Sequence, residues 1–217
     1  MRWLLIHGLP TAGRYWWRLT LPGEVNAPDL PGFGAAKEAT LPSSVSGFLP
    51  SLRAFAGPDT TVVGVDFGGV LAAALAAEGN AGRLVLMSTA LGAAWLPSRW
   101  AAHRPLAGPF YRWSAGQRFL RSADPSGDLA AAFPADEGLA DRMIAVARSL
   151  RVREQWAYKA DIRVPTLCLW GDSDPFLPPA LGRRLAAQLG ARWQTLPGRH
   201  GLAWTAPSEV SSVLTRW

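Results

Sequence analysis

Cysteine is almost absent from this sequence, which contains a single one, Cys168, within the apolar run Thr-Leu-Cys-Leu-Trp. One thiol cannot form a disulfide within the chain, and we expect it to be buried in a strand. Histidine is scarce as well, with three residues, and neither these nor Cys168 have the spacing of metal ligands. We therefore expect no disulfide, no metal and no other cofactor.

The sequence also lacks a long hydrophobic run. Its first apolar segment ends at His7 and Gly8 after a few residues, which is too short for a signal peptide or a membrane span. We expect a cytoplasmic protein that makes no membrane contact. A length of 217 residues suits one domain with a full hydrophobic core and a small inserted lid.

Lysine occurs only at positions 37 and 159, so arginine supplies nearly all of the positive charge. The formal net charge is +6 and the isoelectric point is near 10.4. The arginines are interleaved with acidic and apolar residues, without a basic run or an aromatic RNA-binding strand, so we expect no nucleic-acid partner. Several gather between residues 99 and 163, where they would suit an anionic or phenolate-bearing small molecule.

Short apolar runs rich in Val, Ile and Leu recur along the chain, each followed by Gly or Pro and then by a helical pattern. This alternation is typical of βα units in an α/β fold, with a mostly parallel sheet and helices on both faces. Six strands are predicted, at residues 3–6, 25–27, 61–65, 84–87, 166–170 and 192–195. Helices are predicted at residues 44–56, 68–78, 179–189 and 207–216.

Residues 93–161 break this rhythm, because they hold no convincing strand and several helical patterns rich in Arg, Ala and Trp. We interpret this segment as a helical lid inserted into a core made of residues 1–92 and 162–217. Open α/β sheets bind their ligands at the carboxyl ends of the strands, and an insertion at this point would cover that crevice.

The sequence Gly-Val-Asp-Phe-Gly-Gly, with Asp66 in its third place, follows a β-branched strand and opens an alanine-rich helix. This is the strand, turn and helix context of a nucleophile elbow. Such a turn forces a positive φ on its central residue, and small residues two positions on either side prevent a clash. A carboxylate at a helix start is favoured as the anion, so the sequence predicts an ionised Asp66.

Four further motifs follow in order. They are His-Gly-Leu-Pro at 7–10, Asp-Leu-Pro-Gly-Phe-Gly at 29–34, Trp-Gly-Asp-Ser-Asp-Pro at 170–175 and Gly-Arg-His-Gly at 198–201. Together with the elbow, they resemble the α/β hydrolases of the branch that contains epoxide hydrolases and haloalkane dehalogenases. The resemblance spans the chain apart from the predicted lid and implies the α/β-hydrolase fold.

The resemblance also implies a role for each motif. Asp66 would be the nucleophile, His200 the base and Asp174 the acid that orients the histidine. The backbone amides of Leu9 and Phe67 would form the oxyanion hole.

Two nearby residues have their own interpretations. Asp172 is a rival acid, although the family's Gly-x-x-Asp spacing selects Asp174. His7 is more simply explained as a structural residue that pins its loop beside the end of the first strand.

An aspartate at the nucleophile position limits the substrates. A carboxylate is already ionised at neutral pH and needs no base, whereas a serine does. Its attack on an ester or amide would give a mixed anhydride of higher energy, but its attack on a saturated carbon gives a stable alkyl ester. Water activated by His200 would then hydrolyse that ester. The sequence therefore favours an epoxide or an alkyl halide as the substrate.

The leaving group separates these two substrates, since a departing halide needs N–H donors and a departing alkoxide needs a proton donor such as a tyrosine hydroxyl. Many haloalkane dehalogenases have Asn and Trp at the positions of Leu9 and Phe67, which are both apolar here. This departure favours epoxide opening over dehalogenation. In the predicted lid, Tyr111 and Tyr158 are candidate proton donors, and Tyr158 is the better one.

Eleven tryptophans are a high number for this length. Most should pack in the core or the lid, but Trp16, Trp17 and Trp156 are candidates to line the crevice. Flat apolar walls of this kind would suit a bulky aromatic or polycyclic secondary metabolite.

Other classes of function stay open. Asp66 and His200 could act as an acid–base pair in a non-hydrolytic cyclisation, isomerisation or lyase step, or the chain could be a binding protein with an inherited pocket. All three triad positions hold chemically competent residues, which favours an enzyme. The chain also starts at what the family would call its third strand, so a homodimer or another segment could cover the edge where the leading hairpin usually lies.

Overall fold

A computed structural model describes residues 1–89, 91 and 117–217. Within these residues lies a six-stranded sheet of order β2-β1-β3-β4-β5-β6, in which every neighbouring pair is parallel. The strands are β1 (Arg2–Ile6), β2 (Glu24–Asn26), β3 (Gly57–Val65), β4 (Ala81–Met87), β5 (Thr166–Gly171) and β6 (Arg192–Leu196). The six predicted strands and the α/β-hydrolase fold are thus confirmed.

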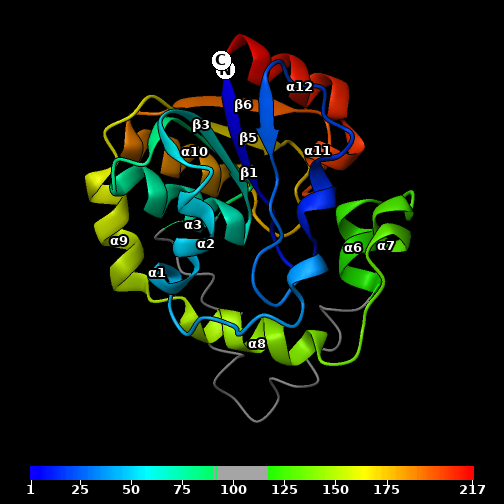
Figure 1. Cartoon of the computed structure of the whole chain (residues 1–217). Helices are drawn as coiled ribbons and strands as arrows, with labels where there is room; N and C mark the ends of the chain where they lie inside the picture. Colours follow the sequence, from blue (N-terminus) through cyan, green and yellow to red (C-terminus); the bar gives the residue numbers. More distant parts are fainter. Residues whose placement is uncertain (90, 92–116) are drawn as a thin grey trace.

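Helices cover both faces of this sheet (Figure 1). One face carries α1 (Val45–Phe48), α2 (Pro50–Arg53), α3 (Phe67–Ala77) and α10 (Pro179–Leu189). The other carries η1 (Gly13–Trp16), α11 (Leu202–Thr205) and α12 (Pro207–Arg216), and a further short helix, η2 (Gly34–Ala36), lies in the loop after β2.

The single helix predicted at residues 44–56 is wrong, because the segment forms the two short helices α1 and α2. Ser44 caps the first by accepting the Gly47 N–H at 3.2 Å. Pro50 stands at the first position of the second, where its missing N–H is tolerated and its fixed φ suits a helix start. The chain therefore restarts at Pro50 instead of continuing one helix.

Successive strand residues point to opposite faces of the sheet. In β1, Leu4 and Ile6 pack in the cluster that includes α3, whereas Trp3 and Leu5 pack in the cluster that includes α12. Both sets are almost fully buried, which explains why the central strands read as continuous apolar runs. Cys168 in β5 is buried and free, as the sequence predicts.

The described part of segment 93–161 is helical, and residues 92–116 lie outside the described residues. Its helices are α6 (Gln117–Ala123), α7 (Asp128–Ala132), α8 (Leu139–Ser149) and α9 (Val152–Asp161). Figure 1 shows α8 across the end of the sheet toward which the strands run, α6 and α7 to one side, and α9 beside α3. None of the described helices is long and apolar enough to cross a bilayer.

Candidate active site

Asp66 stands at the turn between β3 and α3, with a φ of 51° and a ψ of −119°. This conformation is strained for any residue except glycine. The glycines two positions away permit it: a Cβ on Gly64 would lie 2.3 Å from the Gly68 carbonyl oxygen, and one on Gly68 would lie 2.2 Å from that of Ile6. The backbone geometry of a nucleophile elbow is therefore present.

The Asp66 carboxylate lies where backbone N–H groups converge. The Leu9 N–H donates to Asp66 Oδ2 at 3.2 Å. The Phe67 N–H, at the first position of α3, also stabilises the carboxylate. The structure thus brings the two amides that the sequence assigned to an oxyanion hole to the same side chain.

Burial raises the pKa of Asp66 above its ordinary value. A positive charge on His200 and the N–H groups of Phe67 and Leu9 act in the opposite direction without cancelling this effect. The sequence predicted that the helix start would determine the charge state of Asp66, and the structure shows that burial is the stronger influence. The carboxyl group therefore titrates closer to neutral pH than that of a free aspartate.

His200 and Asp174 form a buried pair. Because a carboxylate only accepts, His200 Nδ1 is the donor to Asp174 Oδ2, at 2.8 Å, and Nε2 is left for the cavity. Burial alone would lower the pKa of His200, but the hydrogen bond and charge of Asp174, together with the charge of Asp66, raise it overall. His200 therefore binds a proton more readily than an ordinary histidine.

The geometry selects Asp174 over Asp172 as the partner of His200. Asp172 is exposed, and its carboxylate accepts the Ser173 hydroxyl at 2.9 Å and the Gly198 N–H at 3.1 Å, which ties the two loops together. Burial would raise the pKa of Asp174, but hydrogen bonds from His200 and from two backbone N–H groups lower it overall.

A small cavity of about 20 Å³ lies between Asp66 and His200, with room for about one water molecule. Its lining is mostly apolar and comes from the loop after β1, the elbow, the segment 119–129 and the histidine loop: Gly8, Leu9, Thr11, Tyr15, Val65, Asp66, Phe119, Leu120, Ala123, Leu129, His200 and Gly201. The α6 helix of the predicted lid thus forms one wall of the cavity.

Two phenylalanines flank the catalytic histidine candidate. Phe119 and Phe176 stack with ring centroids 4.4 Å apart. Both rings make T-shaped contacts with the His200 ring, with centroids 6.2 Å away for Phe119 and 5.3 Å away for Phe176. The aromatic surroundings of His200 are therefore built from phenylalanine among the described residues.

His7 pins the loop that carries Leu9. The Leu30 N–H donates to His7 Nε2 at 3.0 Å, so Nδ1 holds the proton and donates to the Gly8 carbonyl at 2.9 Å. Burial lowers the pKa of His7 to about 4, which keeps its ring neutral. These contacts agree with the structural role expected from the sequence.

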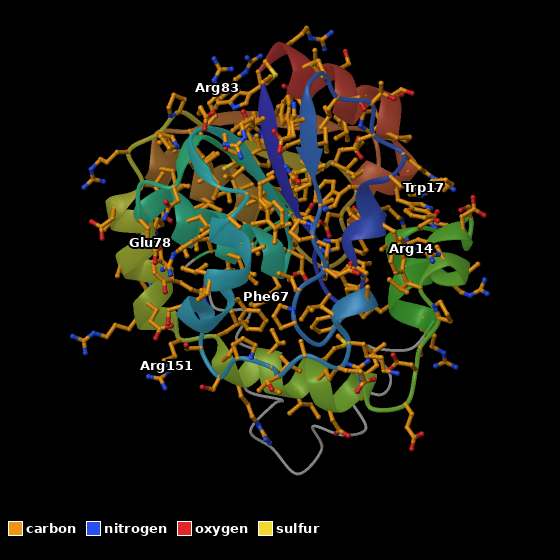
Figure 2. The ribbon with its side chains drawn as sticks, in the orientation of Figure 1. Arg14, Trp17, Phe67, Glu78, Arg83 and Arg151 are labelled. Atoms are coloured by element: carbon orange, nitrogen blue, oxygen red, sulfur yellow. The ribbon has the colours of Figure 1, made fainter. Side chains whose placement is uncertain are left out.

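Tyr158 does not come to the cavity. It is partly buried on α9 against the core, and its pKa is raised by burial and by the charges of Glu154 and Glu78. Glu78 follows the last residue of α3, whereas Asp66 precedes the first. Figure 2 shows Glu78 and Phe67 well apart, toward these two ends. Tyr111 lies outside the described residues.

The three tryptophans expected in the crevice do not line this cavity either. Trp17 is 69% exposed, and Figure 2 shows it at the outer surface beside α6 and α7. Trp156 is 49% exposed, with the Lys159 ammonium 3.6 Å from its ring centroid. Trp16 is buried and packs edge-to-face on Tyr15 at 5.0 Å. The expected tryptophan wall is therefore absent from the described lining.

Sequence reasoning missed Tyr15, which lines the cavity together with Asp66 and His200. It is 3% exposed and lies in η1, directly before Trp16 and Trp17. A run of three aromatic residues in a loop carries no periodic signal that tells which ring faces inward. The nearest signal was its position, a few residues after the His-Gly-Leu-Pro motif.

Residues 3–213 match the sequence model of the alpha/beta hydrolase family, so the chain belongs to that family. Similar solved structures include an esterase from Thermogutta terrifontis, with 20% identity, a TM-score of 0.73, and coverage of 100% of this chain and 89% of the other. A haloalkane dehalogenase from Bradyrhizobium elkani gives 19% identity, a TM-score of 0.75, and coverage of 100% and 89%.

An enol-lactonase from Burkholderia xenovorans gives 18% identity, a TM-score of 0.73, and coverage of 99% of this chain and 90% of the other. At these identities the likenesses show the fold alone, since one fold hosts many activities. The comparison with curated proteins found no match.

Proposed function

We propose that this α/β hydrolase opens an epoxide on a small aromatic molecule through a covalent ester with Asp66. The observation that carries the proposal is the carboxylate at the elbow, held by the Leu9 N–H at 3.2 Å and sharing a cavity with His200. The cavity is small, about 20 Å³, which favours a substrate smaller than the polycyclic one suggested by the tryptophans.

In the first step, an oxygen of Asp66 attacks a ring carbon of the epoxide. The carbon–oxygen bond of the ring breaks, and an alkyl ester and an alkoxide form. The equivalent attack on an ester or amide carbonyl would end at a mixed anhydride, which is higher in energy than the substrate. The aspartate therefore argues for a saturated electrophilic carbon.

In the second step, water attacks the carboxyl carbon of the Asp66 ester. His200 Nε2 takes the proton of this water while Asp174 holds the ring through Nδ1. The amides of Leu9 and Phe67 would stabilise the oxyanion that develops. Collapse of this intermediate leaves Asp66 as the carboxylic acid, and the departing oxygen takes the proton from His200. The proton on Asp66 balances the one taken up by the oxygen that left in the first step, which completes the diol and restores the carboxylate.

A haloalkane substrate fits the cavity less well. The Phe67 side chain packs in the core against Phe48, with ring centroids 5.2 Å apart, and Leu9 is apolar. Neither side chain supplies the N–H donor that a departing halide requires. Dehalogenation would use the same attack by Asp66, but the side chains at positions 9 and 67 offer no donor to a departing halide.

Acid–base chemistry without a covalent ester is the second candidate. The observation in its favour is the raised pKa of Asp66, which brings this carboxyl group closer to the pH at which it could exchange protons. A product that gains no water would indicate this function.

The covalent route can be tested with a His200→Gln variant, which cannot activate water. Incubation with a panel of small aryl epoxides, styrene oxide being the simplest, should add the mass of one epoxide to the intact protein. Peptide mapping should place the addition on Asp66. The double variant His200→Gln, Asp66→Asn is the control and should stay unmodified, and a single variant that never accumulates an adduct would refute the proposal.

A further inference from the structure

We infer that Tyr15 donates the proton to the oxygen that leaves when Asp66 attacks the epoxide carbon. The inference rests on the proposed function, because it names the acid that this function requires. It moves the acid from the predicted lid to the loop after β1. The argument begins with the position of the Tyr15 side chain.

Packing fixes the ring of Tyr15 inside the molecule. The side chain is 3% exposed and lines the same cavity as Asp66 and His200. Trp16 contacts it edge-to-face at 5.0 Å, and Trp204 of α11 stacks on it at 6.5 Å. The ring is thus held beside the cavity by its aromatic neighbours.

No group in the described part of the chain accepts a hydrogen bond from the Tyr15 hydroxyl. The nearby backbone N–H of Ala203 favours the phenolate form of Tyr15. An N–H can only donate to the phenol oxygen and cannot accept the phenol proton. Buried hydroxyl groups in native proteins are rarely left without an acceptor. An oxygen of a bound substrate would supply the missing acceptor.

The charges around Tyr15 suit this role. Burial raises its pKa, the Ala203 N–H opposes this, and the carboxylates of Asp174 and Asp66 raise it further. The phenol therefore stays protonated at neutral pH. An alkoxide is a stronger base than a phenolate, so the oxygen that leaves the epoxide carbon can still take the proton from Tyr15. Ester formation also removes the negative charge of Asp66, and with it one influence that holds the proton on Tyr15.

The proposed step balances without an added reactant. As the bond from Asp66 to the carbon forms, the electron pair of the breaking carbon–oxygen bond passes to the oxygen, which takes the Tyr15 proton. A hydroxyalkyl ester and a Tyr15 phenolate result. Hydrolysis of the ester by one water gives the diol and a protonated Asp66, and this proton returns to Tyr15.

Tyr158 offers a matched comparison. Of the two tyrosines that the structure describes, Tyr15 lines the cavity, whereas Tyr158 lies on α9 near Glu78. Replacing each by phenylalanine removes the same hydroxyl from two different places and keeps both rings.

The test measures ester formation in the His200→Gln background with styrene oxide and with 2-phenylethyl bromide, by rapid quenching and intact mass. Bromide departs without a proton, so its reaction, though slowed by the lack of N–H donors, still reports attack by Asp66, whereas the epoxide oxygen needs a proton. We expect Tyr15→Phe to slow ester formation from the epoxide by roughly 100-fold or more, the typical contribution of a general acid, and to leave the bromide rate within about threefold. Tyr158→Phe should leave both rates within about twofold of the background.

Equal slowing of both probes by Tyr15→Phe would show a packing role and overturn the inference, as would an unchanged epoxide rate. Slowing of the epoxide reaction by Tyr158→Phe would assign the acid to that residue. If the Tyr15→Phe protein does not fold, fluorotyrosine at position 15 replaces it, and its more acidic hydroxyl must alter the epoxide rate selectively. Failure of the proposed function looks different, because the His200→Gln protein with Tyr15 intact would form no ester with either probe.

Discussion

Two buried histidines, His7 and His200, lie in loops at the same end of the sheet, yet their pKa values shift in opposite directions. His7 faces the backbone groups of Leu30 and Gly8, and burial lowers its pKa to about 4. Burial acts on His200 in the same direction, but the carboxylates of Asp174 and Asp66 reverse the result and raise its pKa.

The comparison teaches that burial alone does not decide how readily a histidine exchanges a proton. His7 uses both ring nitrogens on fixed backbone partners, so it has no nitrogen to offer a substrate. His200 uses one nitrogen on a carboxylate and keeps the other beside Asp66 in the cavity. The first histidine holds the scaffold, and the second is equipped to take up and release a proton.

Replacing Asp66 by Asn, next to His200, should reduce turnover more than any other change considered. The amide keeps the size of the side chain but is a poor nucleophile, so turnover of an aryl epoxide should fall by roughly 1,000-fold or more. The pKa of His200, followed by NMR titration, should also fall because one of its raising charges is lost. A variant with turnover within tenfold of the parent would contradict the nucleophile assignment.

Replacing Asp174 by Asn should act mainly on the second step. The amide cannot hold the same histidine tautomer, so we expect ester hydrolysis to slow by roughly 100-fold or more. Ester formation should persist, because it needs no base. Pre-steady-state kinetics should therefore show a burst followed by slow turnover, and equal loss in both steps would argue against a separate role for the pair.

Replacing His7 by Asn tests the structural role of His7, because it should change how stability depends on pH. The folded pKa of about 4 lies below the reference value of 6.5, so between these values the unfolded state binds more protons. Stability should therefore fall as the pH is lowered from 6.5 to 4, with His7 contributing about 3 kcal/mol of that loss. Urea unfolding across this range should show a smaller pH dependence in the His7→Asn variant, and an identical dependence would refute the assignment.

Replacing Trp156 by Ala should have the smallest effect. This side chain is 49% exposed and contacts Lys159 away from both histidines. We expect turnover within about twofold of the parent and a change in unfolding free energy below roughly 1 kcal/mol. A large rise in the Michaelis constant for an aryl epoxide would show that Trp156 contacts the substrate after all.

The sequence was sufficient for the sheet and for the contact between His200 and Asp174. Apolar runs separated by glycine and proline predicted the strands, because a parallel sheet buried on both faces leaves that pattern in the sequence. The elbow glycines predicted the position of Asp66, since a positive φ and a close approach of Gly68 to Ile6 admit few residues. The pairing of His200 with Asp174 followed from the loop motifs.

The sequence was insufficient wherever a side chain depends on distant partners. Tyr15 faces the cavity because Trp204, from the other end of the chain, stacks on its ring. Trp17, two residues later, is exposed. A short loop has no fixed inner face, so the sequence pattern cannot tell which of these aromatic rings is buried. The raised pKa of Asp66 depends on how deeply the folded chain surrounds it, which local helix position does not reveal.

One measurement tests the covalent role of Asp66 most directly. A single turnover of an aryl epoxide by excess enzyme in ¹⁸O-labelled water, followed by mass spectrometry of the Asp66 peptide and of the diol, locates the oxygen that water supplies. If the ester is hydrolysed at its carboxyl carbon, the label enters Asp66 first and the diol of that turnover carries none. Label in the first diol with none in Asp66 would mean that water attacked the epoxide directly, and the account would be wrong.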